Sequence, residues 1–178
     1  MTFSISGYCK KTGMVGVAIT SSSICVTSRC PWVRPGVGAA VTQNITDPSL
    51  GNLILNYLDE GLTSQEAIKK IIHDRDFIEY RQLAVIDTHG NSASYTGAKI
   101  LGTNAVVKNN DCIAAGNLLK SNRTIEDMCK NFSNNPDLHL GERLLLALQA
   151  GLDAGGEEGS IHSAGLKVAF EHPWPLID

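Results

Sequence analysis

The chain has 178 residues, of which 43% are hydrophobic and 19% are charged, and its formal net charge is −3. This length and composition are typical of one domain that spans residues 1–178. The acidic balance argues against a nucleic-acid partner, because a surface that binds nucleic acid needs an excess of Lys and Arg. No apolar run approaches the roughly 20 residues that cross a bilayer, and the start lacks the segments of a secretory signal. We therefore expect neither a membrane association nor a nucleic-acid partner.

Cysteine usage indicates the compartment. The five cysteines are odd in number and scattered, without a C-x-x-C pair; they are Cys9, Cys25, Cys30, Cys112 and Cys129. This pattern predicts reduced thiols in a cytoplasmic protein. The Cys and His residues do not cluster at zinc-ligand spacing, and a glycine-rich phosphate loop is absent, so we expect no metal and no organic cofactor.

The first third of the chain predicts strands. Residues 2–8 and 14–20 flank a turn-like segment, and further strands are expected at residues 24–28 and 36–42, interrupted by prolines. The strand at residues 14–20 is apolar on both of its faces. We therefore expect it to lie buried between two layers.

Two amphipathic helices are expected next. Asp47 and Pro48 are typical of a helix start, and apolar residues then recur on one face over residues 50–58. Thr63 and Glu66 form a capping box before the second helix.

The second half of the chain repeats this order. Strands are predicted at residues 81–87, 91–96 and 111–115, helices after a Thr124–Asp127 capping box and at residues 140–153, and a last strand at residues 160–170. Strands and helices thus come in blocks, which favours an α+β fold over a doubly wound sheet. A four-layer αββα sandwich, with two buried sheets covered by helices, accounts for the apolar second strand.

Thr2 is the leading candidate nucleophile. Removal of Met1 makes Thr2 the first residue, so that one residue carries both a hydroxyl nucleophile and an α-amino group that serves as its base. The amine has a reference pKa of roughly 7.7–8.0, near the pH at which a general base is most efficient. The alternative is that Met-Thr is an ordinary chain start.

Polar residues at other predicted strand ends are candidates for the same site. Ser21 follows the second strand, Gln43 and Asn44 end a later one, and Gly116-Asn117 ends another. A hydroxyl or an amide at such a position can bind substrate or donate to an oxyanion, and Asn117 is the candidate for the oxyanion. Each is also an ordinary turn or cap residue.

Arginines indicate the charge of the substrate. Arg81 precedes a predicted strand and could hold a substrate carboxylate in bidentate fashion. Together with Arg29 and Arg34 it favours an anionic substrate, although such arginines more often form structural salt bridges.

Segments along nearly the whole chain carry a family resemblance. They are Met1-Thr2-Phe3-Ser4-Ile5, Gly16-Val17-Ala18 with Ser21, Pro31-Trp32, Gly36-Val37-Gly38-Ala39, Thr42-Gln43, Asp47-Pro48-Ser49-Leu50-Gly51, Tyr80-Arg81-Gln82-Leu83, Thr96-Gly97, Gly116-Asn117-Leu118-Leu119, Glu142-Arg143-Leu144-Leu145, Ala154-Gly155-Gly156 and Ser163-Ala164. In this order and spacing they resemble the bacterial Ntn-hydrolase-like family known as domain of unknown function ten twenty-eight.

The resemblance implies a fold and a reaction. It implies an αββα sandwich and a hydrolase with an N-terminal nucleophile that cleaves a linear or cyclic C–N amide bond of a small molecule. Carried over by position, Thr2 is the nucleophile, with Ser21, Gln43 and Asn117 near it as hydrogen-bonding or oxyanion groups. We further expect a homo-oligomer, since a sandwich of this size often pairs.

Two differences from the family pattern, and the presence of Met1 before Thr2, leave alternative functions open. Family members often carry a Lys or His where this chain has Ser22, and an Arg within the segment that here reads Gly156-Glu157-Glu158-Gly159. Both changes remove positive charge from loops near the expected pocket. With Met1 attached, the nitrogen of Thr2 is an amide and is no base. The alternatives are a hydrolase that uses another nucleophile or an activated water with Met1 retained, and a non-catalytic ligand-binding protein on the same fold.

Overall fold

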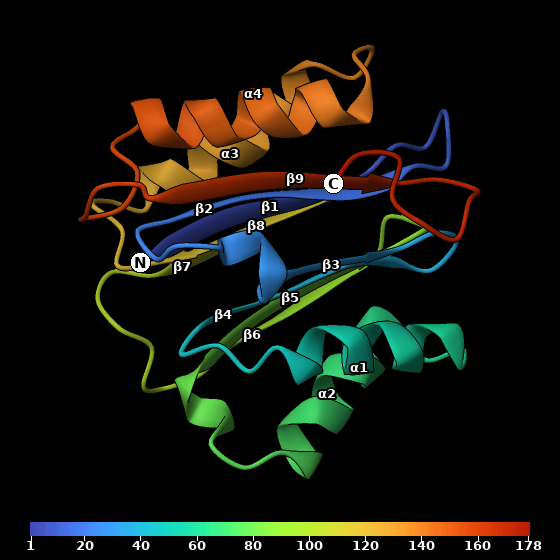
Figure 1. The fold of residues 1–178 in the computed structure, drawn as a ribbon, viewed down its shortest axis with the longest axis horizontal. Coiled ribbons are helices and arrows are strands. Elements are labelled where there is room, and N and C mark those ends of the chain that lie inside the picture. The colour runs from blue at the N-terminus through green and yellow to red at the C-terminus, as the bar shows by residue number, and fades with distance from the viewer.

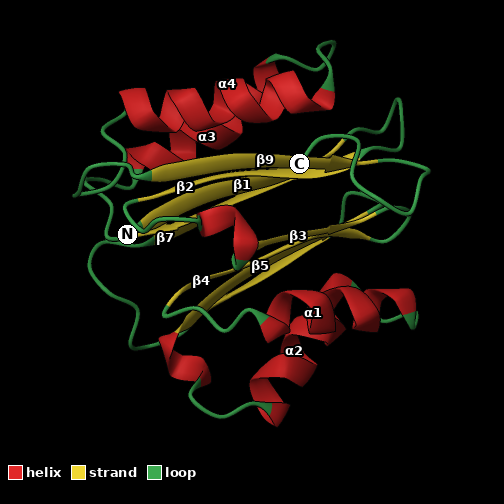
Figure 2. Cartoon of the chain, viewed as in Figure 1, coloured by secondary structure: helices red, strands yellow, loops and turns green.

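The protein is built of four stacked layers. The computed structural model describes residues 1–178, and in it two antiparallel sheets face each other between two pairs of helices (Figure 1). Figure 2 shows that the strands lie at the centre and the helices on the two outer faces. The predicted α+β αββα sandwich is confirmed.

The first sheet contains the N-terminal strand. Its five strands run in the order β7-β8-β1-β2-β9, with bounds β1 Thr2–Tyr8, β2 Val15–Ser21, β7 Ala105–Asn109, β8 Cys112–Asn117 and β9 Ser163–Ala169. Strand β1 therefore lies between β2 and β8, in the middle of the sheet. All seven residues of β2 are buried, as its apolar pattern predicts.

The second sheet has four strands in the order β3-β4-β5-β6. Their bounds are β3 Pro31–Arg34, β4 Gly38–Asn44, β5 Arg81–Asp87 and β6 Ser92–Thr96. The two central strands, β4 and β5, contact β1 and β8 of the first sheet, so the middles of the two sheets lie face to face.

Each sheet is covered by one helix pair. Helices α1 Ser49–Asp59 and α2 Ser64–Asp74 pack on the second sheet, and α3 Arg123–Asn134 and α4 Leu140–Asp153 pack on the first. Short 3-10 helices occupy Val26–Ser28 and Ile78–Tyr80. None of the helices is both long and apolar enough to cross a membrane.

Side-chain alternation along β1 divides its residues between two environments. Phe3 and Ile5 belong to a buried cluster with residues of α3 and α4. Their neighbours Thr2 and Ser4 point to the other face, where Ser4 reaches the second sheet. The polar half of β1 is thus enclosed between the sheets, where each hydroxyl needs a partner.

Most predicted elements are confirmed, and the exceptions have local causes. Residues 24–28 are not a strand, because Cys25 adopts a left-handed conformation (φ 55°) and a 3-10 turn follows it. Strands β3 and β7 were not predicted. The Thr124–Asp127 capping box is wrong: α3 begins after Asn122, and the Thr124 hydroxyl is buried and donates to the carbonyl of Gly156 at 3.2 Å.

The predicted capping box of α2 is present and gives a stability test. The Glu66 carboxylate accepts from the backbone amide of Thr63 at 2.9 Å, and the Thr63 hydroxyl oxygen accepts from the amide of Glu66 at 3.2 Å. Thr63→Ala removes the cap and is expected to cost about 1 kcal/mol, which lowers the melting temperature by about 2–4 °C. Thermal unfolding of the variant beside Thr103→Ala, an exposed threonine outside any helix, checks this, and equal melting temperatures would contradict it.

Candidate active site

Three predicted site residues meet at one end of the first sheet. Thr2 is paired with Ser21 on one neighbouring strand and with Asn117 on the other. Directly opposed residues of antiparallel strands share a face, so the three side chains lie side by side. The hydroxyl oxygens of Thr2 and Ser21 are 3.1 Å apart.

Met1 lies over this group. Its carbonyl oxygen accepts hydrogen bonds from the hydroxyls of Thr2 and Ser21, both at 2.6 Å. Thr2 is 6% exposed, and Met1 is half-buried. While Met1 is attached, the Thr2 hydroxyl is covered and the Thr2 nitrogen is a peptide amide.

A chain of buried amides connects the two sheets beneath Thr2. The Ser4 hydroxyl donates to Gln43 Oε1 at 2.9 Å, Gln43 Nε2 donates to Gln82 Oε1 at 2.8 Å, and Gln82 Nε2 donates to the carbonyl oxygen of Gly116 at 3.0 Å. Asn117 Nδ2 also donates to Gln82 Oε1, at 3.2 Å. The network fixes Gln43 and Asn117, and Gln82 is its centre.

Asn117 retains hydrogen-bonding capacity next to Thr2. Its side chain is fully buried, and its Oδ1 atom has no hydrogen-bond partner. Its one hydrogen bond to Gln82 uses one of two N–H donors. An amide held in this way is suited to interact with a ligand that lies against Thr2.

The polar groups of three other predicted site residues form hydrogen bonds within the protein; these residues are Gly116, Asn44 and Arg81. The Gly116 carbonyl accepts from Gln82, and a Cβ atom at Gly116 would come within 2.8 Å of both Ile125 and Leu119. Asn44 donates to the carbonyl of Tyr80 at 2.8 Å, and Arg81 donates to the carbonyl of Ile45. These two residues lie at the same end of the sandwich as Thr2, but their polar groups order the end of the second sheet.

The other two arginines are also engaged. Arg29 donates to the carbonyls of Ile24 and Cys25 at 2.7 and 3.0 Å. Arg34 donates to Asn56 at 2.8 Å and forms an ion pair with Asp59 at 3.6 Å. Neither arginine is left without a protein partner.

Glu157 is a polar residue of this region that the sequence analysis did not select. It is 2% exposed, and neither carboxyl oxygen has a hydrogen-bond partner. Burial raises the pKa of the carboxyl group. The Met1 amino group, the Ser22 backbone amide and His162 lie near enough to oppose this rise, although none of them forms a hydrogen bond of good geometry with the carboxyl oxygens. The only hint in the sequence was its place in a glycine-rich segment of the family pattern.

The backbone holds Glu157 beside the end of β8. Glu157 forms an isolated β-bridge with Leu119, and the next amide, of Glu158, donates to the carbonyl of Leu118 at 2.9 Å. Gly156, which precedes it, has a φ of 65°, a conformation that favours glycine. The segment after α4 is thereby directed back toward Thr2.

The raised pKa of Glu157 predicts a pH-dependent stability. In the unfolded chain the Glu157 carboxyl group loses its proton near the ordinary pKa of 4.5, whereas in the folded chain it does so at a higher pH. Folding stability therefore falls as the pH rises from about 4.5 through the raised pKa of the folded state. The Glu157→Gln side chain does not titrate, so the variant does not lose this stability. As pH rises over this range, its melting temperature is expected to rise relative to that of the wild type, by about 2–4 °C for each ~1 kcal/mol. Melting curves between acidic and neutral pH, with exposed Glu158→Gln as control, check this. A difference that is constant with pH would contradict it.

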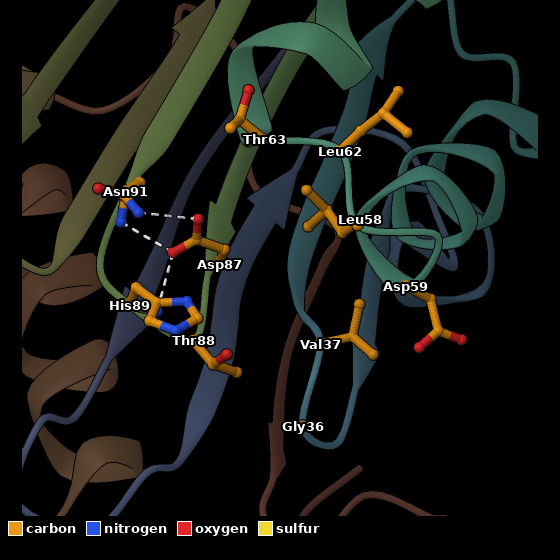
Figure 3. A pocket seen from close by; sticks show the side chains of 11 residues that line it. Gly36, Val37, Leu58, Asp59, Leu62, Thr63, Asp87, Thr88, His89 and Asn91 are labelled. Atoms are coloured by element: carbon orange, nitrogen blue, oxygen red, sulfur yellow. Dashed lines mark hydrogen bonds between the residues drawn. The ribbon is translucent and has the colours of Figure 1, made fainter.

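A separate cavity of about 430 Å³ lies at the opposite end of the second sheet (Figure 3). The Asp87 carboxylate at its wall accepts from the amides of His89 and Asn91 at 2.8 and 2.9 Å. These hydrogen bonds order the β5–β6 turn, so the Asp87 carboxylate has a structural role there.

The structure has no group of three or more His, Cys, Asp or Glu side chains placed to hold a metal ion.

Comparison with known proteins decides the family. A sequence model described as a family of unknown function, DUF1028, matches residues 2–178. The chain belongs to this family. A comparison with curated protein sequences gave no match.

Solved structures agree with the family and the fold. The crystal structure of protein SPO2555 from Silicibacter pomeroyi, of the same family, is similar with a TM-score of 0.91 and 29% identity over 99% of this chain and 79% of that chain. HslV from Trypanosoma brucei is similar with a TM-score of 0.53 and 13% identity over 97% of this chain and 100% of that chain. The resemblance to the DUF1028 family and the Ntn-hydrolase-like fold are both confirmed.

Proposed function

We propose that this DUF1028 protein is a hydrolase that cleaves a linear or cyclic C–N amide bond of a small molecule through Thr2. The observation that carries the proposal is the position of Thr2. It opens the central strand of an Ntn-hydrolase-like sheet, with its hydroxyl 3.1 Å from that of Ser21. The buried amide of Asn117 lies on its other side, on the neighbouring strand.

Removal of Met1 activates the site in two ways. It uncovers the two hydroxyls that donate to the Met1 carbonyl. It also converts the amide nitrogen of Thr2 into an α-amine with a reference pKa of roughly 7.7–8.0. The nucleophile and its base then belong to one residue, which the fold fixes in a central strand.

The reaction needs no cofactor. Thr2 Oγ1 bonds to the amide carbon, its proton passes to the α-amine, and the amine delivers that proton to the nitrogen that leaves as the C–N bond breaks. Water then attacks the ester at Thr2; the α-amine takes a proton from the water and returns it to Oγ1 as the acid departs. The Ser21 hydroxyl and the Asn117 amide supply donors for the oxyanion of both steps, and Gln82 holds Asn117 in place.

The experiment that tests the proposal is a search for amine release and for the acyl-enzyme. Protein whose mass shows the loss of Met1 is incubated with linear and cyclic amides, and the amine set free is measured. Digestion and mass spectrometry then locate the acyl group. Amine release with an adduct on the peptide that begins at Thr2 supports the proposal. Release accompanied by an adduct on another residue, or unaffected by retained Met1, would overturn it.

A further inference from the structure

Met1 fills a fitted space in front of Thr2. Its carbonyl accepts from the Thr2 and Ser21 hydroxyls. Its side chain lies on the backbone of Gly159, where a Cβ atom would come within 2.7 Å of Met1 Cε and 2.9 Å of Sδ. The same position is 3.6 Å from Ser22 Cβ, so the loops after β2 and before β9 form the two walls. One aminoacyl residue, Met1, occupies this space.

A buried carboxyl group lies close to that space. Glu157 precedes Gly159, which Met1 contacts, by two residues, and neither of its oxygens has a hydrogen-bond partner. Burial raises the pKa of this carboxyl group, and the Met1 amino group opposes the rise through its charge, without a direct ion pair. A buried carboxyl group without partners is costly. Such a group is expected to have a ligand, and the ligand that suits it is a cation that donates hydrogen bonds.

We propose that this space, once Met1 has left it, is the acyl-side subsite of the enzyme, and that it binds α-aminoacyl amides whose free primary amine is held by Glu157. The inference rests on the proposed function and names its substrate class. The substrate carbonyl takes the place of the Met1 carbonyl beside Thr2 and Ser21. Its ammonium group, one residue upstream of Thr2, then lies in the region of the Met1 amine, from which it reaches the Glu157 carboxylate.

The charges around the site favour a cationic group over the anionic substrate that the arginines suggested. Arg81, Arg29 and Arg34 all have protein partners. Glu157 is the buried charged side chain here whose polar atoms have none. The Gly159 backbone leaves room for an unbranched side chain such as that of methionine, which occupies it now.

Binding to an inactive variant tests the subsite without turnover. The Thr2→Ala protein, with loss of Met1 verified by mass, is titrated calorimetrically with L-methioninamide and with N-acetyl-L-methioninamide. We expect the free amine to bind at least ten-fold tighter. Adding Glu157→Gln is expected to abolish this preference, and adding Glu158→Gln, an exposed neighbour, to leave it intact. Equal affinities, or a preference that survives Glu157→Gln, would overturn the inference.

Turnover separates this inference from the proposed function. Protein with Thr2 exposed is given the p-nitroanilides of L-methionine and of N-acetyl-L-methionine. Selective binding of methioninamide without cleavage of any amide leaves the subsite supported and contradicts the proposed hydrolase. Cleavage of both anilides at equal kcat/KM supports the hydrolase and overturns the subsite. A Glu157→Gln variant that loses kcat equally on both, with a shifted pH profile, also overturns it, because Glu157 would then serve the Thr2 amine.

Discussion

Replacing Thr2 with alanine is expected to lower the kcat of amide hydrolysis by about 10³-fold or more, because it removes the atom that forms the covalent intermediate in the proposed mechanism. The free energy of unfolding is expected to change by about 1 kcal/mol or less, because the Thr2 hydroxyl forms hydrogen bonds only with Met1 and Ser21, at the end of the sheet. Amine-release kinetics and thermal unfolding of the same preparations measure both quantities.

Two variants control this prediction. Thr2→Ser keeps the hydroxyl and the α-amine and is expected to retain most of the activity. Ser21→Ala removes one candidate oxyanion donor and is expected to lower kcat by about 10²-fold. A Thr2→Ala protein that keeps more than a tenth of the wild-type kcat would contradict the assignment of the nucleophile.

Replacing Gln82 with alanine is expected to have the largest effect on stability. Gln82 is fully buried, accepts from both Gln43 and Asn117, and donates to Gly116. Its loss leaves the amide donors of Gln43 and Asn117 without a partner between the sheets and removes one hydrogen bond to the Gly116 carbonyl. At about 1–3 kcal/mol for each group, and with incomplete additivity, we expect a loss of about 3–5 kcal/mol. The melting temperature should fall by about 10 °C.

An exposed glutamine provides the matched control for Gln82. Gln149 lies on α4, where its amide donates to Asp153 at 2.8 Å in solvent, and Gln149→Ala is expected to change stability by less than about 0.5 kcal/mol. Urea unfolding of both variants separates the buried network from the general effect of truncation. Equal losses would show that the network contributes nothing specific.

The sequence predicts the regular elements where hydrophobic periodicity and caps agree. The strand at Arg81–Asp87, the helix at Leu140–Asp153 and the capping box of α2 lie at the predicted residues. Strand β3 was missed because it begins with Pro31, which is tolerated there as the first residue of an edge strand. Strand β7 was missed because it is a half-exposed edge strand with little alternation.

The sequence predicts only those site residues that lie at the ends of predicted strands. Polar residues at the ends of neighbouring strands place Thr2, Ser21 and Asn117 together, as the register confirms. Gln82 and Glu157 could not be selected, because their importance comes from burial, and burial of a polar residue is decided by which sheet or loop packs over it. The homo-oligomer, the cytoplasmic location and the roles of the site residues stay predictions.

The central claim is that Thr2 acts as an N-terminal nucleophile, and one measurement tests it most directly. The mass of the N-terminal peptide is determined in preparations that retain Met1 to different extents, and amide hydrolysis is measured on the same samples. The account predicts that kcat rises in proportion to the fraction of chains that begin with Thr2, and that an aminopeptidase activates the remainder. Full activity in protein whose N-terminal peptide still begins with Met1 would contradict it.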